Sequence, residues 1–133
     1  MDLNFFTANG QQIAEVIAAD VVITDVRDAL DLMANADYQG ARRVILYVRN
    51  LSPEFFDLRT GLVGEIVQKF ANYRVKLAVV GEFAKFDSRS LHAFIVESNR
   101  GDLAFFVPDR ETAIVKLTII SLSASGLLFG QIL

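Results

Sequence analysis

The chain of 133 residues contains no cysteine and a single histidine. Without cysteine, disulfides, thiolate metal sites and cysteine nucleophiles are excluded, and we expect a reducing, cytoplasmic location. The histidine, His92, stands beside Leu91 and Phe94 in a predicted helix, so a metal site would have only carboxylates and one imidazole to use. We therefore expect His92 to be a partly exposed structural residue, and we predict neither a metal nor a cofactor.

Basic residues are neither numerous nor clustered. Thirteen lysines and arginines stand against sixteen aspartates and glutamates, which gives a formal net charge of -3, and the basic residues are scattered along the chain. Nucleic-acid binding needs a concentrated basic face that neutralises phosphates. We therefore expect no nucleic-acid partner.

Neither end of the chain has the pattern of an export signal or a membrane span. The opening residues, MDLNFFTANG, lack the basic and apolar regions of a signal peptide. The segment 118–133 carries no charge, but its sixteen residues fall short of the roughly 20 apolar residues that span a bilayer. We expect this tail to pack against the domain or against a partner subunit, where it would support a homodimer. An unpacked extension and a membrane contact are the alternatives.

The common motifs of nucleotide binding and of serine hydrolases, GxGxxG, GxxxxGK[ST] and GxSxG, do not occur. Carboxylates do follow two predicted strands, with Glu54 and Asp57 after the first and Glu82 and Asp87 after the second. Because sites in open α/β sheets lie beyond the carboxyl ends of strands, these four residues could face one crevice and bind a hard cation. A solvated loop rim gives the same pattern, and we expect no enzymatic activity.

What the sequence does have is a hydrophobic content of 53%, which is enough for one core. The dipeptide Asn9-Gly10 between two apolar runs predicts an antiparallel β-hairpin. Three further runs are apolar and rich in β-formers, namely RVILYV (43–48), VKLAVVG (75–81) and LAFFV (103–107). Continuous apolar runs of this kind are typical of strands that are buried on both faces of a parallel sheet.

Helical patterns alternate with these strands, over residues 25–38, from about 58–61 to 72, over 88–101 and over 108–117. The expected N-caps of three of them are Asp25 or Thr24 for the first, Ser88 for the third and Asp109 for the last. We predict one α/β domain over residues 1–117, with a mixed, mostly parallel sheet, an N-terminal β-hairpin and alternating strands and helices.

The stretch FFDLRTGLVGEIVQKF, residues 55–70, places two glycines at the front of an amphipathic helix. Each glycine costs about 1 kcal/mol relative to alanine in a helix interior. Gly61 and Gly64 would let another chain or an anionic group approach the backbone closely, and Thr60 would lie in the first helical turn. The alternative is that Thr60 is an ordinary first-turn residue and that the glycines serve close packing of the helix on the sheet.

Two further places are candidates for a contact surface. Phe83 and Phe86 lie in a predicted loop, where they either fold back on the core or present an apolar patch to a partner. Asn99 and Arg100 lie at a helix end, where they form either a polar C-terminal cap or part of a surface.

Three long strings carry a family resemblance that covers roughly residues 10–117. They are DALDLMANADYQGARRVIL, LSPEFFDLRTGLVGEIVQKFANYRVKLAVVGEF and ESNRGDLAFFV. They resemble a bacterial family that is catalogued as domain of unknown function 4180. This resemblance implies no established activity.

The order of hairpin, helix and alternating strands and helices is also similar to STAS domains, the antagonists of anti-sigma factors. In STAS regulators an Asp-Ser-Ser-Gly motif opens the helix after a strand, and the residue before its glycine is phosphorylated. Asp57, Leu58, Arg59, Thr60 and Gly61 occupy that place here, with one extra residue and with Leu58-Arg59 where small hydroxyl residues are usual. The resemblance implies that Thr60 is the phosphorylation switch.

We therefore expect a cytoplasmic, non-enzymatic regulatory module of STAS-like type that binds a protein partner or a second copy of itself. The expected partner or ligand surface is made of residues on the loops and helix ends named above: Phe55, Asp57, Arg59, Gly61, Gly64, Phe83, Phe86, Asn99 and Arg100. The alternative is a small-molecule or lipid-binding domain, with its pocket between the sheet ends and the loops at 55–58 and 83–86.

Overall fold

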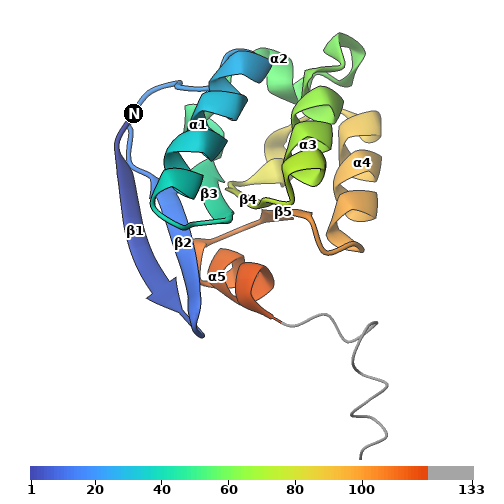
Figure 1. The fold of residues 1–133 in the computed structure, drawn as a ribbon. Coiled ribbons are helices and arrows are strands. Elements are labelled where there is room, and N and C mark those ends of the chain that lie inside the picture. Colours follow the sequence, from blue (N-terminus) through green and yellow to red (C-terminus); the bar gives the residue numbers. More distant parts are fainter. Residues whose placement is uncertain (120–133) are drawn as a thin grey trace, which may run out of the picture.

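A β-hairpin opens the fold, as the Asn9-Gly10 dipeptide predicts. Strands β1 (Leu3–Ala8) and β2 (Gln11–Val16) pair antiparallel, and both turn residues have positive φ angles, 50° at Asn9 and 76° at Gly10. These are the backbone angles of a type I′ turn, whose twist matches that of the flanking strands. The hairpin forms one edge of the sheet (Figure 1).

The computed structural model describes residues 1–119, which form a five-stranded sheet in the order β1-β2-β3-β4-β5. The remaining strands are β3 (Arg43–Tyr47), β4 (Lys76–Val80) and β5 (Ala104–Val107). Strands β2 to β5 all pair in parallel. The prediction of a mixed, mostly parallel sheet behind an N-terminal hairpin is therefore confirmed.

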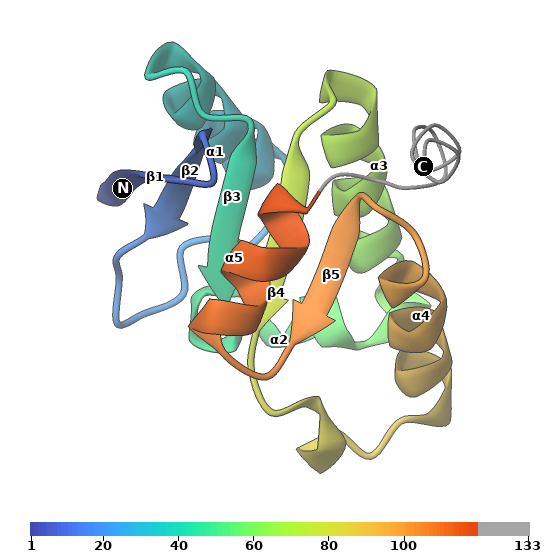
Figure 2. The ribbon, with the colours of Figure 1, turned by 90° about the horizontal axis from the view of Figure 1, so that it is seen from below.

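The helices divide between the two faces of the sheet. They are α1 (Val26–Tyr38), α2 (Pro53–Phe56), α3 (Leu62–Tyr73), α4 (Arg89–Asn99) and α5 (Arg110–Thr118). The strands follow one another in order, so successive crossovers of one hand leave α1, α3 and α4 on the same face. Helix α5 lies on the opposite face, as the two views show (Figures 1 and 2).

Each face of the sheet has its own apolar cluster. The larger cluster joins the inner sides of α1, α3 and α4 to one face, with Leu32, Phe70 and Leu91 fully buried. The smaller one joins Ala113 and Leu117 of α5 to the other face. Side chains alternate along a strand, so a strand that packs on both clusters is apolar throughout, which explains the unbroken runs in the sequence.

The expected N-caps of three helices are confirmed. The carboxylate of Asp25 accepts a hydrogen bond from the Asp28 amide, and the Ser88 hydroxyl accepts one from the Leu91 amide. Asp109 caps α5 through the Thr112 amide at 2.7 Å. Each cap satisfies one of the backbone donors that a helix start leaves free.

The expected role of the tail 118–133 falls almost entirely outside the described residues. Thr118 is the last residue of α5 and is buried, while Ile119 follows the helix and is exposed. Within residues 1–119, no helix combines the length and the apolar character that a membrane crossing requires.

Candidate functional site

The carboxyl ends of β3 and β4 open on the same edge of the sheet because the two strands are parallel. Residues 48–61 follow β3 and contain α2 and two 3-10 turns, η1 (Val48–Asn50) and η2 (Leu58–Thr60). Residues 81–90 follow β4 and contain a further 3-10 turn, η3 (Phe83–Lys85). We call these two segments together the carboxyl-edge surface, since ligand sites of open α/β sheets lie at this position.

A cluster of phenylalanine rings lies beneath this surface. Phe56 stacks on Phe86 with ring centroids 4.7 Å apart, and Phe83 meets Phe106 of β5 edge to face at 5.5 Å. Phe83 and Phe86 are both half-buried, so they fold back on the core. Phe55 is fully buried, and the expectation that it belongs to a contact surface is wrong because its ring packs inside this cluster.

A groove of about 430 Å³ crosses the carboxyl-edge surface. Its lining combines apolar and polar side chains: Pro53, Phe56, Asp57, Leu58, Arg59, Phe86, Asp87, Ser88 and Ser90. This is where the sequence predicts a pocket for a small molecule, between the loops at 55–58 and 83–86.

Asp57 and Arg59 form an exposed ion pair at this groove. The Arg59 Nη2 lies 2.9 Å from the Asp57 Oδ2, and the Arg59 side chain is 90% exposed. Hydrogen bonds from the Arg59 side chain and amide lower the pKa of Asp57, and the same pair raises the pKa of Arg59. The guanidinium is thus held in place while its outer side faces solvent.

Thr60 occupies a different position from the one predicted. Helix α3 begins at Leu62, and Thr60 instead ends η2, separated from α3 by Gly61 with a φ of 77°. The left-handed backbone at Gly61 turns the chain between the two helical segments, which is why the helix does not start at 58–61. The Thr60 hydroxyl lies 2.8 Å from the carbonyl oxygens of both Glu54 and Asp57.

The two glycines singled out in the sequence do not serve close packing. A side chain at Gly61 or at Gly64 would meet nothing within 4 Å, and both residues are exposed. Close packing occurs instead at Gly81, directly after β4, where an added Cβ would lie 3.0 Å from the Val48 Cβ and closer still to its Cγ2. The expectation of helix-to-sheet packing at Gly61 and Gly64 is wrong, and Gly81 lets the loops after β3 and β4 touch.

The four carboxylates after β3 and β4 converge only in part. Asp57 and Asp87 line the same groove, whereas Glu54 and Glu82 are exposed outside its lining. Among residues 1–119, no three His, Asp or Glu side chains gather where they could hold a metal ion.

His92 connects α4 to the loop after β4. Its Nε2 lies 2.7 Å from the Phe86 carbonyl oxygen. A carbonyl only accepts, so Nε2 carries the proton and donates. The bond fixes the backbone at Phe86, and His92 is half-buried, as a structural histidine is expected to be.

Asn99 has a structural partner in place of an open surface. Its side-chain amide donates to the Phe106 carbonyl at 3.0 Å and accepts from the Phe106 amide at 2.7 Å. The neighbouring Ser98 hydroxyl donates to the Ala104 carbonyl at 2.6 Å. Since β5 is an edge strand, α4 supplies the hydrogen-bond partners that a further strand would otherwise supply. Arg100 is exposed and pairs with Glu97, 3.2 Å away.

Sequence reasoning missed a buried ionic network on the α5 face. Glu15 of β2 is 4% exposed and its carboxylate accepts from Arg110 of α5, from the Tyr47 hydroxyl and from Asn4. Arg110 also lies over the Phe6 ring, 4.7 Å from its centroid. The only sign of it in the sequence is the charged residue Glu15 near the end of a strand, on the same side as Ile13. Nothing in the sequence indicates which residue pairs with it.

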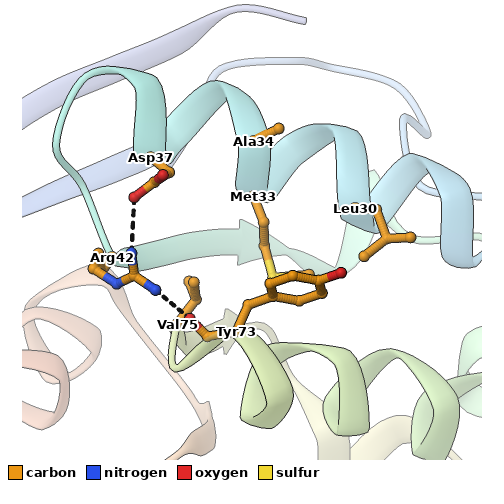
Figure 3. Close-up of a pocket in the computed structure, with 7 residues that line it drawn as sticks. All are labelled: Leu30, Met33, Ala34, Asp37, Arg42, Tyr73 and Val75. Atoms are coloured by element: carbon orange, nitrogen blue, oxygen red, sulfur yellow. Dashed lines mark hydrogen bonds and ion pairs between the residues drawn. The ribbon is translucent and has the colours of Figure 1, made fainter.

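A second groove lies at the other end of the parallel strands, where β3 and β4 begin, between the C-terminal ends of α1 and α3 (Figure 3). It has a volume of about 310 Å³, and Arg42 bridges it by donating to Asp37 at 2.8 Å and to the Tyr73 carbonyl. This arginine binds the last turn of α3, which is a common way to satisfy free carbonyls at a helix end. The arrangement fixes two helix ends.

Comparison with known proteins gives one result. No curated protein and no solved structure matches the chain. Residues 8–117 match the model of a family described as Domain of unknown function (DUF4180). This match spans β2, the parallel strands and all five α-helices up to Leu117, so it covers every part of the carboxyl-edge surface. The chain belongs to the DUF4180 family.

Proposed function

We propose that this protein is a cytoplasmic, non-enzymatic module of STAS-like type that binds a protein partner through the carboxyl-edge surface and is switched at Thr60. The observation that supports the proposal is the position of the Thr60 hydroxyl. It lies within hydrogen-bond distance of the Glu54 and Asp57 carbonyls and accepts from the Leu62 amide at 3.2 Å. One exposed side chain therefore ties α2, η2 and α3 together.

Phosphorylation of Thr60 would undo this tie. When a kinase transfers a phosphoryl group from a nucleoside triphosphate to the hydroxyl oxygen, the nucleoside diphosphate leaves and the hydroxyl proton is lost. The Glu54 and Asp57 carbonyls then lose the hydroxyl donor and keep only the backbone amides of Asp57 and Thr60. The ester adds about 1.5 to 2 negative charges. The first amides of α3 lie immediately after Thr60 at the positive end of the helix dipole, where they attract this charge. Modification would thus favour a rearranged loop.

The Asp57 and Arg59 pair extends the effect to the exposed surface. A phosphate on Thr60 would compete with Asp57 for the Arg59 guanidinium, because a dianion attracts it more strongly than a single carboxylate does. The groove lining, with Asp57, Arg59 and Asp87 as its charged residues, would then present a more negative surface to a docked partner. A binding switch of this kind requires no catalytic group.

The decisive experiment combines modification mapping with binding. Intact mass and phosphopeptide mapping of the protein from its native host test whether Thr60 is modified. Cross-linking in the same cells then compares wild type with Thr60→Glu and with its neutral isostere Thr60→Gln. We expect Thr60→Glu to recover fewer cross-linked partners than Thr60→Gln, because both variants lack the hydroxyl and only Thr60→Glu adds a negative charge. Unmodified Thr60 under every growth condition, or equal partner recovery by both variants, would contradict the switch.

A small-molecule or lipid-binding role is the second candidate. It is favoured by the groove of about 430 Å³ with Phe56, Leu58 and Phe86 in its lining. Native mass spectrometry of the purified protein tests it. An added mass that Leu58→Glu abolishes would support a ligand in this groove, and bare protein in repeated preparations would count against it.

A further inference from the structure

The two edges of the sheet are treated differently. Three outward groups of β5, the Ala104 carbonyl and the Phe106 carbonyl and amide, are bonded by Ser98 and Asn99 of α4, so that edge is covered over most of its length. On the other side, β1 is the outermost strand, and in Figure 1 no labelled element lies beyond it. Among residues 1–119, no strand other than β2 pairs with β1.

The register identifies which backbone groups face outward. The Ile17 amide donates to the Asp2 carbonyl at 2.9 Å, so the pair 2 and 17 is hydrogen-bonded. Hydrogen-bonded and open pairs alternate along an antiparallel ladder, which makes the even residues of β1 the ones that bond to β2. The amides and carbonyls of Leu3, Phe5 and Thr7 therefore point away from the sheet. No backbone partner for these three residues occurs among residues 1–119.

The side chains of this edge lack the usual protection. Exposed edge strands are normally blunted by lysine, proline or a bulge. Strand β1 has the sequence LNFFTA, with no charge, no proline and an uninterrupted register over six residues. Leu3 and Phe5 are half-buried on the α1 face, and Phe6 is half-buried on the other. A strand added here would cover apolar surface on both faces.

We propose that β1 is a dimer interface, in which β1 of a second copy pairs antiparallel with it and joins the two sheets into one. Because β1 carries no charge, it can pair with its own copy without like-charge repulsion. It also offers no charge that would attract an oppositely charged partner strand, so a second copy is the favoured partner. A two-fold axis at Phe5 pairs the outward residues with one another, Phe5 with Phe5 and Leu3 with Thr7 of the other copy. The interface is isologous and closes after two subunits.

This dimer is independent of the carboxyl-edge surface. Strand β1 lies at the hairpin edge of the sheet, and none of its residues lines the groove beside Thr60. If Thr60 proves not to be a switch, the proposal of a β1 interface still stands. If the protein proves to be a monomer, the proposal of a switch at Thr60 still stands.

The test uses the full chain and sedimentation equilibrium over a range of concentrations. We expect wild type to dimerise. Thr7→Pro removes an outward amide without breaking a bond to β2 and should weaken the dimer by about tenfold or more, because two inter-strand hydrogen bonds are lost. The matched control Thr7→Val keeps the amide and should keep the dimer. If Thr7→Pro does not fold, Thr7→Lys with Gln12→Lys as control gives the same comparison, because Gln12 faces Thr7 across the hairpin.

Hydrogen exchange supplies a second measurement. The amides of Leu3, Phe5 and Thr7 should be protected in the wild-type dimer, and those of Leu3 and Phe5 should exchange freely in Thr7→Pro, which has no amide at position 7. A monomeric wild type at every concentration would overturn the proposal, as would a dimer that survives both edge variants. Protection of these amides in a monomer, with contacts to residues 120–133 of the same chain, would also overturn it.

Discussion

Arg110 places its Nε 2.9 Å from one oxygen of Glu15 and its Nη2 3.1 Å from the other, across 95 residues of sequence. The bidentate pair joins α5 to β2. The Glu15 side chain is only 6% exposed, whereas the Arg110 side chain is 46% exposed, so one partner is buried and the other reaches solvent. The network thereby anchors α5, which is the only α-helix on this face of the sheet within residues 1–119.

Removal of this arginine should destabilise the fold. Arg110→Met leaves the buried Glu15 carboxylate short of two charge-assisted hydrogen bonds, and we expect the free energy of unfolding to fall by about 1 to 3 kcal/mol. The control is Arg100→Met, whose exposed partner Glu97 should make the loss about 0 to 1 kcal/mol. Urea denaturation measures both, and equal losses would show that the buried pair contributes no more than the exposed one.

Stability should depend on pH at the acid end. Burial raises the pKa of Glu15, but hydrogen bonds from Arg110, Tyr47 and Asn4 outweigh burial and leave the pKa lowered. A carboxyl with a lowered folded pKa contributes stability above its unfolded value, here 4.5, and loses it as the pH falls through the folded pKa. The stability difference between wild type and Glu15→Gln should therefore be constant near neutrality and shrink below about pH 4.5. A difference that does not change in acid would contradict the role of the carboxylate charge.

The alkaline end should show the opposite sign. Burial and the hydrogen bond to Glu15 raise the pKa of Tyr47 from 10.0 to about 12. The neutral phenol contributes stability that is present below the unfolded value and lost as the pH rises toward about 12. Ultraviolet titration should reveal one tyrosine that ionises at higher pH than the others, and this step should be missing in Tyr47→Phe. Identical titration curves for the two proteins would refute this assignment.

Glycine substitutions should separate close packing from helix propensity. Gly81→Ala brings a methyl group against Val48 and should destabilise the protein by about 1 to 3 kcal/mol. Gly64→Ala, in open space on α3, should be neutral or stabilising by up to about 1 kcal/mol. The double variant Val48→Ala/Gly81→Ala should recover part of the loss. Thermal unfolding checks the order, and a Gly81→Ala variant as stable as wild type would show that Val48 moves aside freely.

Asn99 should protect the β5 edge. Asn99→Ala removes both bonds to Phe106 and should cost about 1 to 3 kcal/mol, since a donor and an acceptor at the edge lose their partners. The opened edge should also increase self-association. Arg100→Ala, one residue along and exposed, is the control. Light scattering and denaturation measure the two effects, and a variant that stays as stable and as dispersed as wild type would contradict them.

The sequence predicts the framework well because the framework depends on local signals. The Asn9-Gly10 turn, the apolar runs of β3 to β5 and the capping residues Asp25, Ser88 and Asp109 each act within a few residues. Hydrophobic periodicity predicts the helices between the strands, and the division of the helices between the two faces follows from the handedness of the crossovers. Apart from the start of α3, these elements occur where the sequence predicts them.

The candidate site was predicted less well because its details depend on contacts between distant segments. The start of α3 moved to Leu62 because Gly61 adopts a left-handed conformation, which the sequence permits but does not require. In the sequence, Asn99 does not differ from any other polar residue at a helix end, and only the fold brings β5 beside it. The partners of Glu15 lie on β1, β3 and α5, and no pattern within β2 indicates them.

Helix α5 meets the first hairpin at both of its ends. Arg110 binds Glu15 at its start, and Thr118 accepts from the Asn9 side chain at 2.8 Å at its end. During synthesis the hairpin emerges first, but its partners emerge 95 and 109 residues later. Domains generally fold as units, and contacts so distant in sequence form slowly. The Glu15 carboxylate therefore lacks its arginine partner until nearly the whole domain has been translated, although Asn4 and Tyr47 are made much earlier.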